Sequence, residues 1–269
     1  MIPPASPAHA TPRRLDVFLI PALSDNYIHL LRCAATAKVA VVDPAEAAPV
    51  VAALERRGWA LDLIVNTHHH GDHVGGNLEL KARYGAAIVG PAADRDRIPG
   101  IDRAVADGES FTLGDCPFTG IDVPGHTRGH IAFHGAEDAV LFSGDTLFSM
   151  GCGRLFEGTP DQMWHSLTRL RALPAETAVY CGHEYTAGNG RFALTLEPDN
   201  ADLAARVKEV TALRADDRPT LPTTIAVERA TNPFLRADLP ALAAAVGLGG
   251  QDPVAVFAEI RRRKDNFRG

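Results

Sequence analysis

The feature that most constrains this chain is a turn that crowds imidazoles and a carboxylate together. The segment Thr67-His68-His69-His70-Gly71-Asp72-His73 directly follows an apolar run at residues 61–65. Imidazole and carboxylate are ligands for zinc, manganese and iron(II), and the absence of a nearby thiolate argues against a structural zinc finger. The alternative is a His-rich surface turn, but a buried-looking strand that runs into so many ligand groups is an unusual way to build one. The turn therefore predicts a metal site.

Three later segments share a pattern with this turn: a strand-like apolar run ends, a glycine or turn follows, and a metal-type ligand comes next. These segments are residues 118–126, 140–145 and 178–183. Because loops at the carboxyl ends of strands meet at one edge of a sheet, their ligands can converge on the turn. The predicted metal ligands are His68, His70, Asp72, His73, His126, Asp145 and His183. This set is too large for one tetrahedral ion and suits two ions that share a carboxylate; a single Fe(II) that uses fewer of these ligands is the alternative.

The order of predicted strands and helices indicates an α/β protein. Short apolar or alternating runs predict strands over residues 16–20, 27–33, 38–43, 86–89, 110–113, 118–123, 130–133, 139–143 and 178–181. Apolar residues at helical spacing predict helices over residues 45–57, 77–84 and 160–173. Strands with interspersed helices predict helices packed outside one sheet or two.

The character of the sequence changes beyond about residue 190. Helical spacing recurs over residues 202–213, 239–246 and 253–264, and we predict no strand among them. Residues 217–232, which include Pro219 and Pro222, are predicted to be an extended connector. We therefore predict a flexible tail at residues 1–14, a main domain at residues 15–189 and a helical domain at residues 190–269.

Composition narrows the classes of partner. A net charge of −6 gives no global basic field, so we expect no nucleic acid partner. No apolar run approaches the roughly 20 residues that cross a bilayer, and residues 1–14 lack the apolar centre of a secretory signal. The four cysteines are far apart and form no C-x-x-C pair, which favours free thiols in a reducing cytoplasm. We expect a cytoplasmic monomer that acts on a small molecule and not on a membrane.

The order of the metal-type residues, Thr-His-x-His-x-Asp-His and then His126, Asp145 and His183, resembles the metallo-β-lactamase superfamily, whose fold is an αββα sandwich. More narrowly, the chain resembles the glyoxalase II (hydroxyacylglutathione hydrolase) family from about Asp16 to Phe267. The motifs that carry this resemblance are Leu23-Ser24-Asp25-Asn26-Tyr27, Val42-Asp43-Pro44, Gly144-Asp145-Thr146-Leu147-Phe148, Gly151-Cys152-Gly153-Arg154, Cys181-Gly182-His183-Glu184-Tyr185-Thr186, Asn232-Pro233-Phe234 and residues 261–265.

The resemblance implies a role for each site residue. One metal would be bound by His68, His70 and His126, and the other by Asp72, His73 and His183, with Asp145 as the bridge. It implies two divalent ions per chain, with zinc as the first choice and iron or manganese as alternatives. Asp72 would also orient the bridging hydroxide, whereas His69 would not be a ligand and His130 would support the site by hydrogen bonding. The implied substrate contacts are Arg154, Phe156, Tyr185, Arg261 and Lys264; the last two place glutathione binding in the helical domain.

The reaction implied is hydrolysis of the thioester S-lactoylglutathione, an S-(2-hydroxyacyl)glutathione, to glutathione and D-lactate, the second step of methylglyoxal detoxification. A metal-bridged hydroxide would attack the carbonyl, so no serine or cysteine nucleophile is needed, and the sequence has no G-x-S-x-G motif. One alternative is a glutathione persulfide dioxygenase with a single Fe(II), which would consume oxygen. Another is a metal-binding protein without catalysis, which would turn over no thioester.

Overall fold

Two six-stranded β-sheets form the centre of the fold in this computed structural model, which describes residues 14–269. The first sheet contains, side by side in this order, β1 (Leu15–Ala22), β2 (Asn26–Cys33), β3 (Val39–Val42), β4 (Leu63–Val65), β5 (Ala87–Pro91) and β6 (Arg103–Val105). Strands β1 to β3 are antiparallel, and β3 to β6 run parallel.

The second sheet contains, in spatial order, β14 (Thr223–Thr224), β13 (Ala178–Cys181), β10 (Val140–Gly144), β9 (Ile131–Gly135), β8 (Cys116–Asp122) and β7 (Ser110–Leu113). Only the β10–β13 pair is parallel among these neighbours. A short hairpin of β11 (Leu147–Phe148) and β12 (Gly151–Cys152) follows β10. Both β10 and this hairpin lead directly into segments that carry predicted site residues.

The strands in the middle of the first sheet are buried on both faces. Successive side chains of a strand point to opposite faces, so Val42 and Val65 pack between the sheets against Phe142 of the second sheet. On the outer face of the same strands, Val41 and Ile64 pack against α1 (Ala47–Arg57) and α3 (Asn77–Tyr84). This double burial explains why β3 and β4 are continuous apolar runs without alternation.

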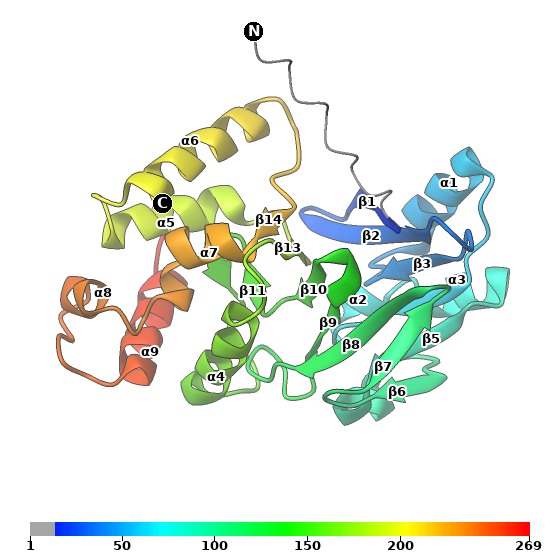
Figure 1. Ribbon diagram of the computed structural model, residues 1–269, viewed down its shortest axis with the longest axis horizontal. Helices are drawn as coiled ribbons and strands as arrows, with labels where there is room; N and C mark the ends of the chain where they lie inside the picture. Colours follow the sequence, from blue (N-terminus) through cyan, green and yellow to red (C-terminus); the bar gives the residue numbers. More distant parts are fainter. Residues whose placement is uncertain (1–13) are drawn as a thin grey trace, which may run out of the picture.

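Helix α4 (Pro160–Arg171) covers the outer face of the second sheet. Thr159 caps its first turn together with Gln162, and Met163, Leu167 and Leu170 form its buried side. The C-terminal helices α5 (Thr186–Leu196), α6 (Ala201–Ala215), α7 (Ile225–Thr231), α8 (Pro240–Ala245) and α9 (Pro253–Asp265) lie on the same side of the molecule, opposite α1 and α3 (Figure 1). Short helical turns complete the chain at α2 (Gly71–Val74), η1 (Ala92–Arg97), η2 (Ala136–Asp138) and η3 (Pro233–Leu235). The expected αββα arrangement with a C-terminal helical region is confirmed.

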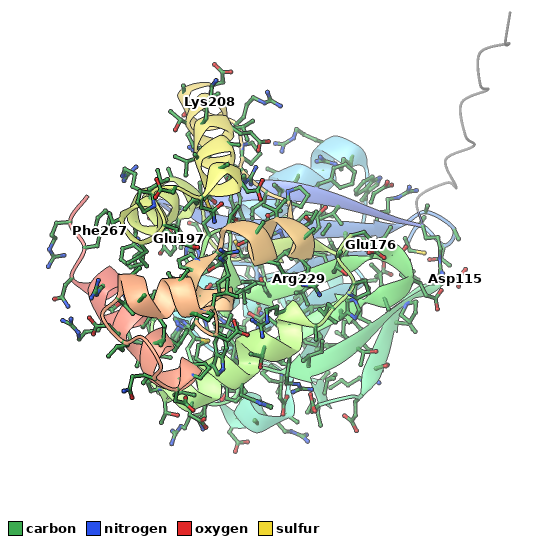
Figure 2. All side chains as sticks on the ribbon, turned by 60° about the vertical axis from the view of Figure 1, so that its left-hand side comes forward. Asp115, Glu176, Glu197, Lys208, Arg229 and Phe267 are labelled. Carbon is green, nitrogen blue, oxygen red and sulfur yellow. The ribbon has the colours of Figure 1, made fainter. Side chains whose placement is uncertain are left out.

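Past the end of α9, the chain turns back onto α5. Phe267 lies beside α5 (Figure 2), with its ring 5.5 Å from that of Phe192 and roughly edge-on to it. The basic end of α9 also lies close to the start of α5, because Nζ of Lys264 donates to the carbonyl of Gly188 at 3.2 Å.

Two predictions about the C-terminal region are wrong. A strand does follow residue 190, because Thr223 and Thr224 form β14 and pair with β13. Residues 217–232 are not wholly extended, since they include α7, whose first turn is capped by the Thr224 hydroxyl accepting from the nitrogen of Val227 at 3.2 Å. Both elements are too short for periodicity to mark them.

Helix α5 was not predicted, because it contains Gly188 and Gly190, which weaken helical propensity. Packing explains Gly190: a Cβ there would lie 2.7 Å from a methyl carbon of Val207. Of the predicted tail at residues 1–14, residues 1–13 lie outside the described part, while Arg14 contacts the carboxylate of Glu137. Within residues 14–269, no helix has both the length and the apolar character to cross a membrane.

Candidate functional site

Asp43, which follows β3, holds the His-rich turn in place. Its carboxylate accepts hydrogen bonds from the backbone nitrogen and the hydroxyl of Thr67, at 2.8 and 2.6 Å. The same carboxylate lies 3.1 Å from Nδ1 of His73, and Asn66 donates to the carbonyl of His73 at 3.0 Å. With Nδ1 turned toward a carboxylate, the buried His73 presents Nε2 to the site.

The predicted metal ligands come together in two groups. Within each group, one ligand atom from every residue lies within 4.8 Å of the others. The groups are His68, His70 and His126, and Asp72, His73 and His183. They are the same two sets that the sequence resemblance implied.

Asp145 lies between the two groups. Its Oδ2 is 3.4 Å from Nε2 of His126 in the first group and 3.3 Å from Nε2 of His183 in the second. Its Oδ1 is 3.5 Å from Nε2 of His73. One buried carboxylate thus reaches both groups, which is the position that a bridging ligand needs.

Each predicted ligand follows the carboxyl end of a strand, and glycine makes the close approach possible. The His-rich turn follows β4, His126 follows β8, Asp145 follows β10 and His183 follows β13. A Cβ at Gly182 would lie 2.6 Å from Oδ1 of Asp145, so no larger residue fits beside the ligands there. The repeated pattern of strand, turn and ligand therefore reflects real convergence at one edge of the sandwich.

Several polar atoms of the site lack partners within the protein. Nε2 of His73 and Oδ1 of Asp145 are buried, and neither has a hydrogen-bond partner among the described residues. In the first group, Nε2 of His68 and of His126 lie 3.1 and 3.0 Å from one atom, Nδ1 of His70. Lone pairs that converge in this way are stabilised by a cation. These His and Asp groups therefore fit a divalent metal.

The electrostatic environment keeps the two aspartates ionised. The imidazole of His73, whose Nε2 lies 3.5 Å from Oδ2 of Asp72, holds the pKa of Asp72 below its usual range. Burial opposes ionisation of Asp145, but the neighbouring imidazoles of His73 and His183 lower its pKa well below the usual value. Burial also lowers the pKa of His68. The carboxylate of Asp145 raises the pKa of His73 and of His183 despite their burial, so both rings hold a proton that a metal would displace, because neutral imidazole is the form that binds a metal.

Hydrogen bonds from outside the two groups orient the ligand rings. Nδ1 of His183 lies 2.8 Å from Oδ1 of Asp25, and Nδ1 of His126 lies 2.9 Å from the carbonyl oxygen of Arg154. Each contact leaves Nε2 directed at the site. As expected, His130 supports the site by hydrogen bonding: its Nε2 accepts from the backbone nitrogen of Asp145 at 3.0 Å. The supporting role of Asp25 was not predicted, although the residue lies in a motif that carries the resemblance.

A cavity of about 540 Å³ is lined by members of both ligand groups, His70, His126, Asp72 and His183, together with Asp145. All predicted substrate contacts line this cavity: Arg154, Phe156, Tyr185, Arg261 and Lys264. Asp265 and Arg268, which were not predicted, line it as well. Residues up to 198 positions apart in the sequence, from His70 to Arg268, therefore share one space.

The aromatic residues of the cavity lie over the ligands. Tyr185 stacks on His183 with ring centroids 4.7 Å apart and planes 2° from parallel. The ring of Phe156 is 5.1 Å from that of His126 and 5.8 Å from that of His70, and the residue is 62% exposed. These rings place apolar surface next to the ligand atoms on two sides.

The cationic residues of the cavity differ in their exposure and in their contacts with the rest of the protein. Arg154 is exposed, whereas Arg261 is buried and donates to the carbonyl of Cys152 at 2.8 Å and to Asp265 at 2.9 Å. Lys264 lies over the rings of Phe192 and Phe267, with Nζ 5.6 and 5.5 Å from their centroids. Burial and the nearby charge of Arg261 together lower the pKa of Lys264 to about 8.

Comparison with known proteins gives the same result for both parts of the chain. Residues 25–183 match the metallo-beta-lactamase superfamily, and residues 184–267 match the family described as hydroxyacylglutathione hydrolase C-terminus. The hydroxyacylglutathione hydrolase of Methylococcus capsulatus is 59% identical over 255 residues, which are 95% of this chain and 100% of that protein.

Two solved structures are similar to this chain. ETHE1 from Myxococcus xanthus has a TM-score of 0.64 at 24% identity, over 93% of this chain and 98% of its own. TTHA1623 in a di-iron-bound form has a TM-score of 0.57 at 26% identity, over 80% of this chain and 98% of its own. The first likeness shows a shared fold, and the near-complete relative at 59% identity shows the family. The resemblance carried by the motifs is confirmed: this chain belongs to the hydroxyacylglutathione hydrolase (glyoxalase II) family within the metallo-β-lactamase superfamily.

Proposed function

We propose that this chain hydrolyses the thioester S-lactoylglutathione to glutathione and D-lactate. The observation that carries the proposal is the cavity, which is lined by members of both ligand groups and by Arg154, Arg261 and Lys264. Cationic side chains concentrated there in a chain of net charge −6 suit the two carboxylates of glutathione. The full-length relative at 59% identity carries the name of this activity.

We propose further that two divalent ions bind per chain, zinc in the first place and iron or manganese as alternatives. The arrangement of two three-ligand groups around Asp145 supports two ions, and the di-iron form of TTHA1623 supports iron as an option. When bound, such ions supply a water activated at neutral pH and polarise the thioester carbonyl.

The chain's own residues position the reactants. Asp72 accepts a hydrogen bond from Nδ2 of Asn26 at 3.1 Å and lines the cavity, so its ionised carboxylate can orient the attacking water by accepting a hydrogen bond from it. Tyr185 and the basic residues hold the tripeptide. A thiol leaving group with a pKa near roughly 8.5 departs as thiolate without strong acid assistance.

The remaining features of the proposal concern the organisation of the chain. Residues 15–189 would act as the catalytic domain and residues 190–269 as the substrate-binding domain of a monomer. A cytoplasmic location is consistent with the cysteines at 33, 116, 152 and 181, which are free and buried.

The decisive experiment is the rate of free-thiol release from S-lactoylglutathione by metal-replete protein. Rapid release supports the proposal. Oxygen uptake with glutathione persulfide, without thioester hydrolysis, would favour the dioxygenase alternative over this proposal. A metal-loaded protein that acts on neither substrate would favour the metal-binding protein without catalysis.

Arg154→Ala is expected to raise the Michaelis constant for S-lactoylglutathione by about 5- to 50-fold, with a smaller change in kcat. Arg154 is exposed at the cavity and can bind a carboxylate in a fork, while Phe156 beside it has no hydroxyl to donate. Steady-state kinetics checks this, with Arg56→Ala as a control at another exposed arginine, in the last turn of α1, that does not line the cavity. An unchanged Michaelis constant in Arg154→Ala would exclude this side chain from substrate binding.

The Michaelis constant is also expected to rise between pH 7 and 9. The lowered pKa of Lys264, about 8, means that its ammonium is mostly charged below pH 8 and mostly neutral above it. Only the charged form attracts a carboxylate, so affinity falls as the pH passes 8. Lys264→Met should have a high Michaelis constant that varies less over this range. Parallel pH profiles for both proteins would show that another group is responsible.

A further inference from the structure

A network of charged side chains connects the His-rich turn to the loop at residues 153–158, and the proposed reaction does not use it. His69 stands between two predicted ligands, and its Nδ1 lies 2.9 Å from Oδ2 of Asp94. The carboxylate of Asp94 is fully buried and also receives Nε of Arg97 at 3.1 Å. A Cβ at Gly129 would lie 2.2 Å from Oδ1 of Asp94, so the fold leaves room for this carboxylate.

Arg97 continues the network into the loop. Its guanidinium donates to both carboxylate oxygens of Glu157, at 2.6 and 3.1 Å. Glu157 also accepts from the backbone nitrogen of Arg128 at 2.8 Å. The pairing with Arg97 holds the pKa of Glu157 at about 2, so the pair is charged throughout the neutral range. Two-point charge-assisted pairing of half-buried groups fixes geometry more firmly than an exposed ion pair does.

The loop that Glu157 anchors touches the metal ligands. Backbone hydrogen bonds tie its two ends, from Gly153 to Thr146 at 3.2 Å and from Gly158 to Gly125 at 3.0 Å. Between these ends, Phe156 lies over two ligand rings although most of its surface is exposed. The carbonyl that orients His126 belongs to Arg154, in the same loop. A shift of the loop would therefore move a ligand's hydrogen bond and two cavity residues together.

We propose that Arg97 and Glu157 form a clamp that positions the 153–158 loop over the metal site. Arg97 is held in place by the buried Asp94 and pairs with Glu157 of the loop. Asp94 also contacts His69, so the loop and the His-rich turn are connected through the same buried carboxylate. Arg97 and Glu157 are positioning residues, because neither lines the substrate cavity. The competing interpretation is an ion pair that only stabilises the fold.

The test compares Arg97→Met, Glu157→Gln and the double variant. Arg83→Met is the matched control, because it breaks an arginine–glutamate pair of the same 2.6 Å length with Glu55, at the surface helices α1 and α3. The first readout is hydrogen exchange of the backbone amides of residues 154–158 in metal-loaded protein without substrate. Exchange there is expected to be about tenfold faster than in the wild type in each single variant. The double variant should exchange at the same rate as the single variants, because all three lose the same ion pair, and the exchange rates of the central strands should not change.

The second readout is kinetic and rests on the proposed function. In these variants the Michaelis constant for S-lactoylglutathione should rise by about 3- to 30-fold, with a smaller fall in kcat. In a further variant, Arg97→Ala, added methylguanidine should restore part of the lost activity by taking the place of the missing guanidinium. Unchanged exchange at residues 154–158, or a lowered unfolding midpoint with kinetics like those of Arg83→Met, would overturn the clamp. A protein inert toward the thioester would refute the proposed function, and hydrogen exchange would still decide the clamp.

Discussion

Replacing Asp145 with alanine is expected to remove most of the bound metal and to lower thioester hydrolysis by more than about 100-fold, the upper range seen when only an outer partner of a ligand is lost. The carboxylate lies within 3.5 Å of Nε2 of His73, His126 and His183. Without it, both ligand groups lose the carboxylate that they share, although that of Asp72 still lies within 3.5 Å of Nε2 of His73 and of His183. Elemental analysis and thiol release on the same sample measure both effects.

His69→Ala is the matched control for this variant, since it removes an imidazole from the same turn. His69 contacts Asp94 and Arg97 but belongs to neither ligand group. We expect full metal content and little loss of hydrolysis. If fully active wild-type protein holds only one tightly bound metal, the two-metal proposal is wrong, whatever the variants do.

The ligand residues could be predicted from the sequence because each lies in the turn or loop that follows a strand, whereas their division into two groups came from the family resemblance. Strand ends are local features, and the burial of β4 and β10 on both faces makes them visible as apolar runs. The convergence of their loops then follows from the general behaviour of strands in layered sheets. The α/β fold class could be predicted for a similar reason, because a chain of alternating strands and helices can form few layered arrangements other than helices packed outside sheets.

The charged network could not be predicted in this way. Asp94, Arg97 and Glu157 are ordinary polar residues, and Glu157 lies 60 positions from Arg97 in the sequence. Their pairing depends on how the loop packs against η1, and the periodicity of apolar residues in the sequence does not indicate this packing. Arg261 has the same limitation: its hydrogen bond to the carbonyl of Cys152 spans 109 positions and shows that this residue supports the β11–β12 hairpin in addition to lining the cavity.

Arg261→Ala combined with Lys264→Ala is expected to raise the Michaelis constant for S-lactoylglutathione by about 10- to 100-fold and to leave kcat largely intact. The two residues lie three apart on α9 and line the cavity without belonging to either ligand group, so they are expected to hold the ground state and the transition state alike. Arg261→Ala alone should also cost stability, because it leaves the carbonyl of Cys152 buried without this donor.

The neighbouring residues of the same helix provide the control. Arg262 and Arg263 pair with Glu259, and neither lines the cavity, so replacing both with alanine removes the same number of charges without touching the site. A small thioester that lacks the tripeptide separates binding from fold. The cavity variant should lose efficiency on S-lactoylglutathione and keep it on the small thioester, whereas the control should keep both. Equal losses on the two substrates would mean that Arg261 and Lys264 only support the fold, because a contact with glutathione cannot matter to a substrate that has none.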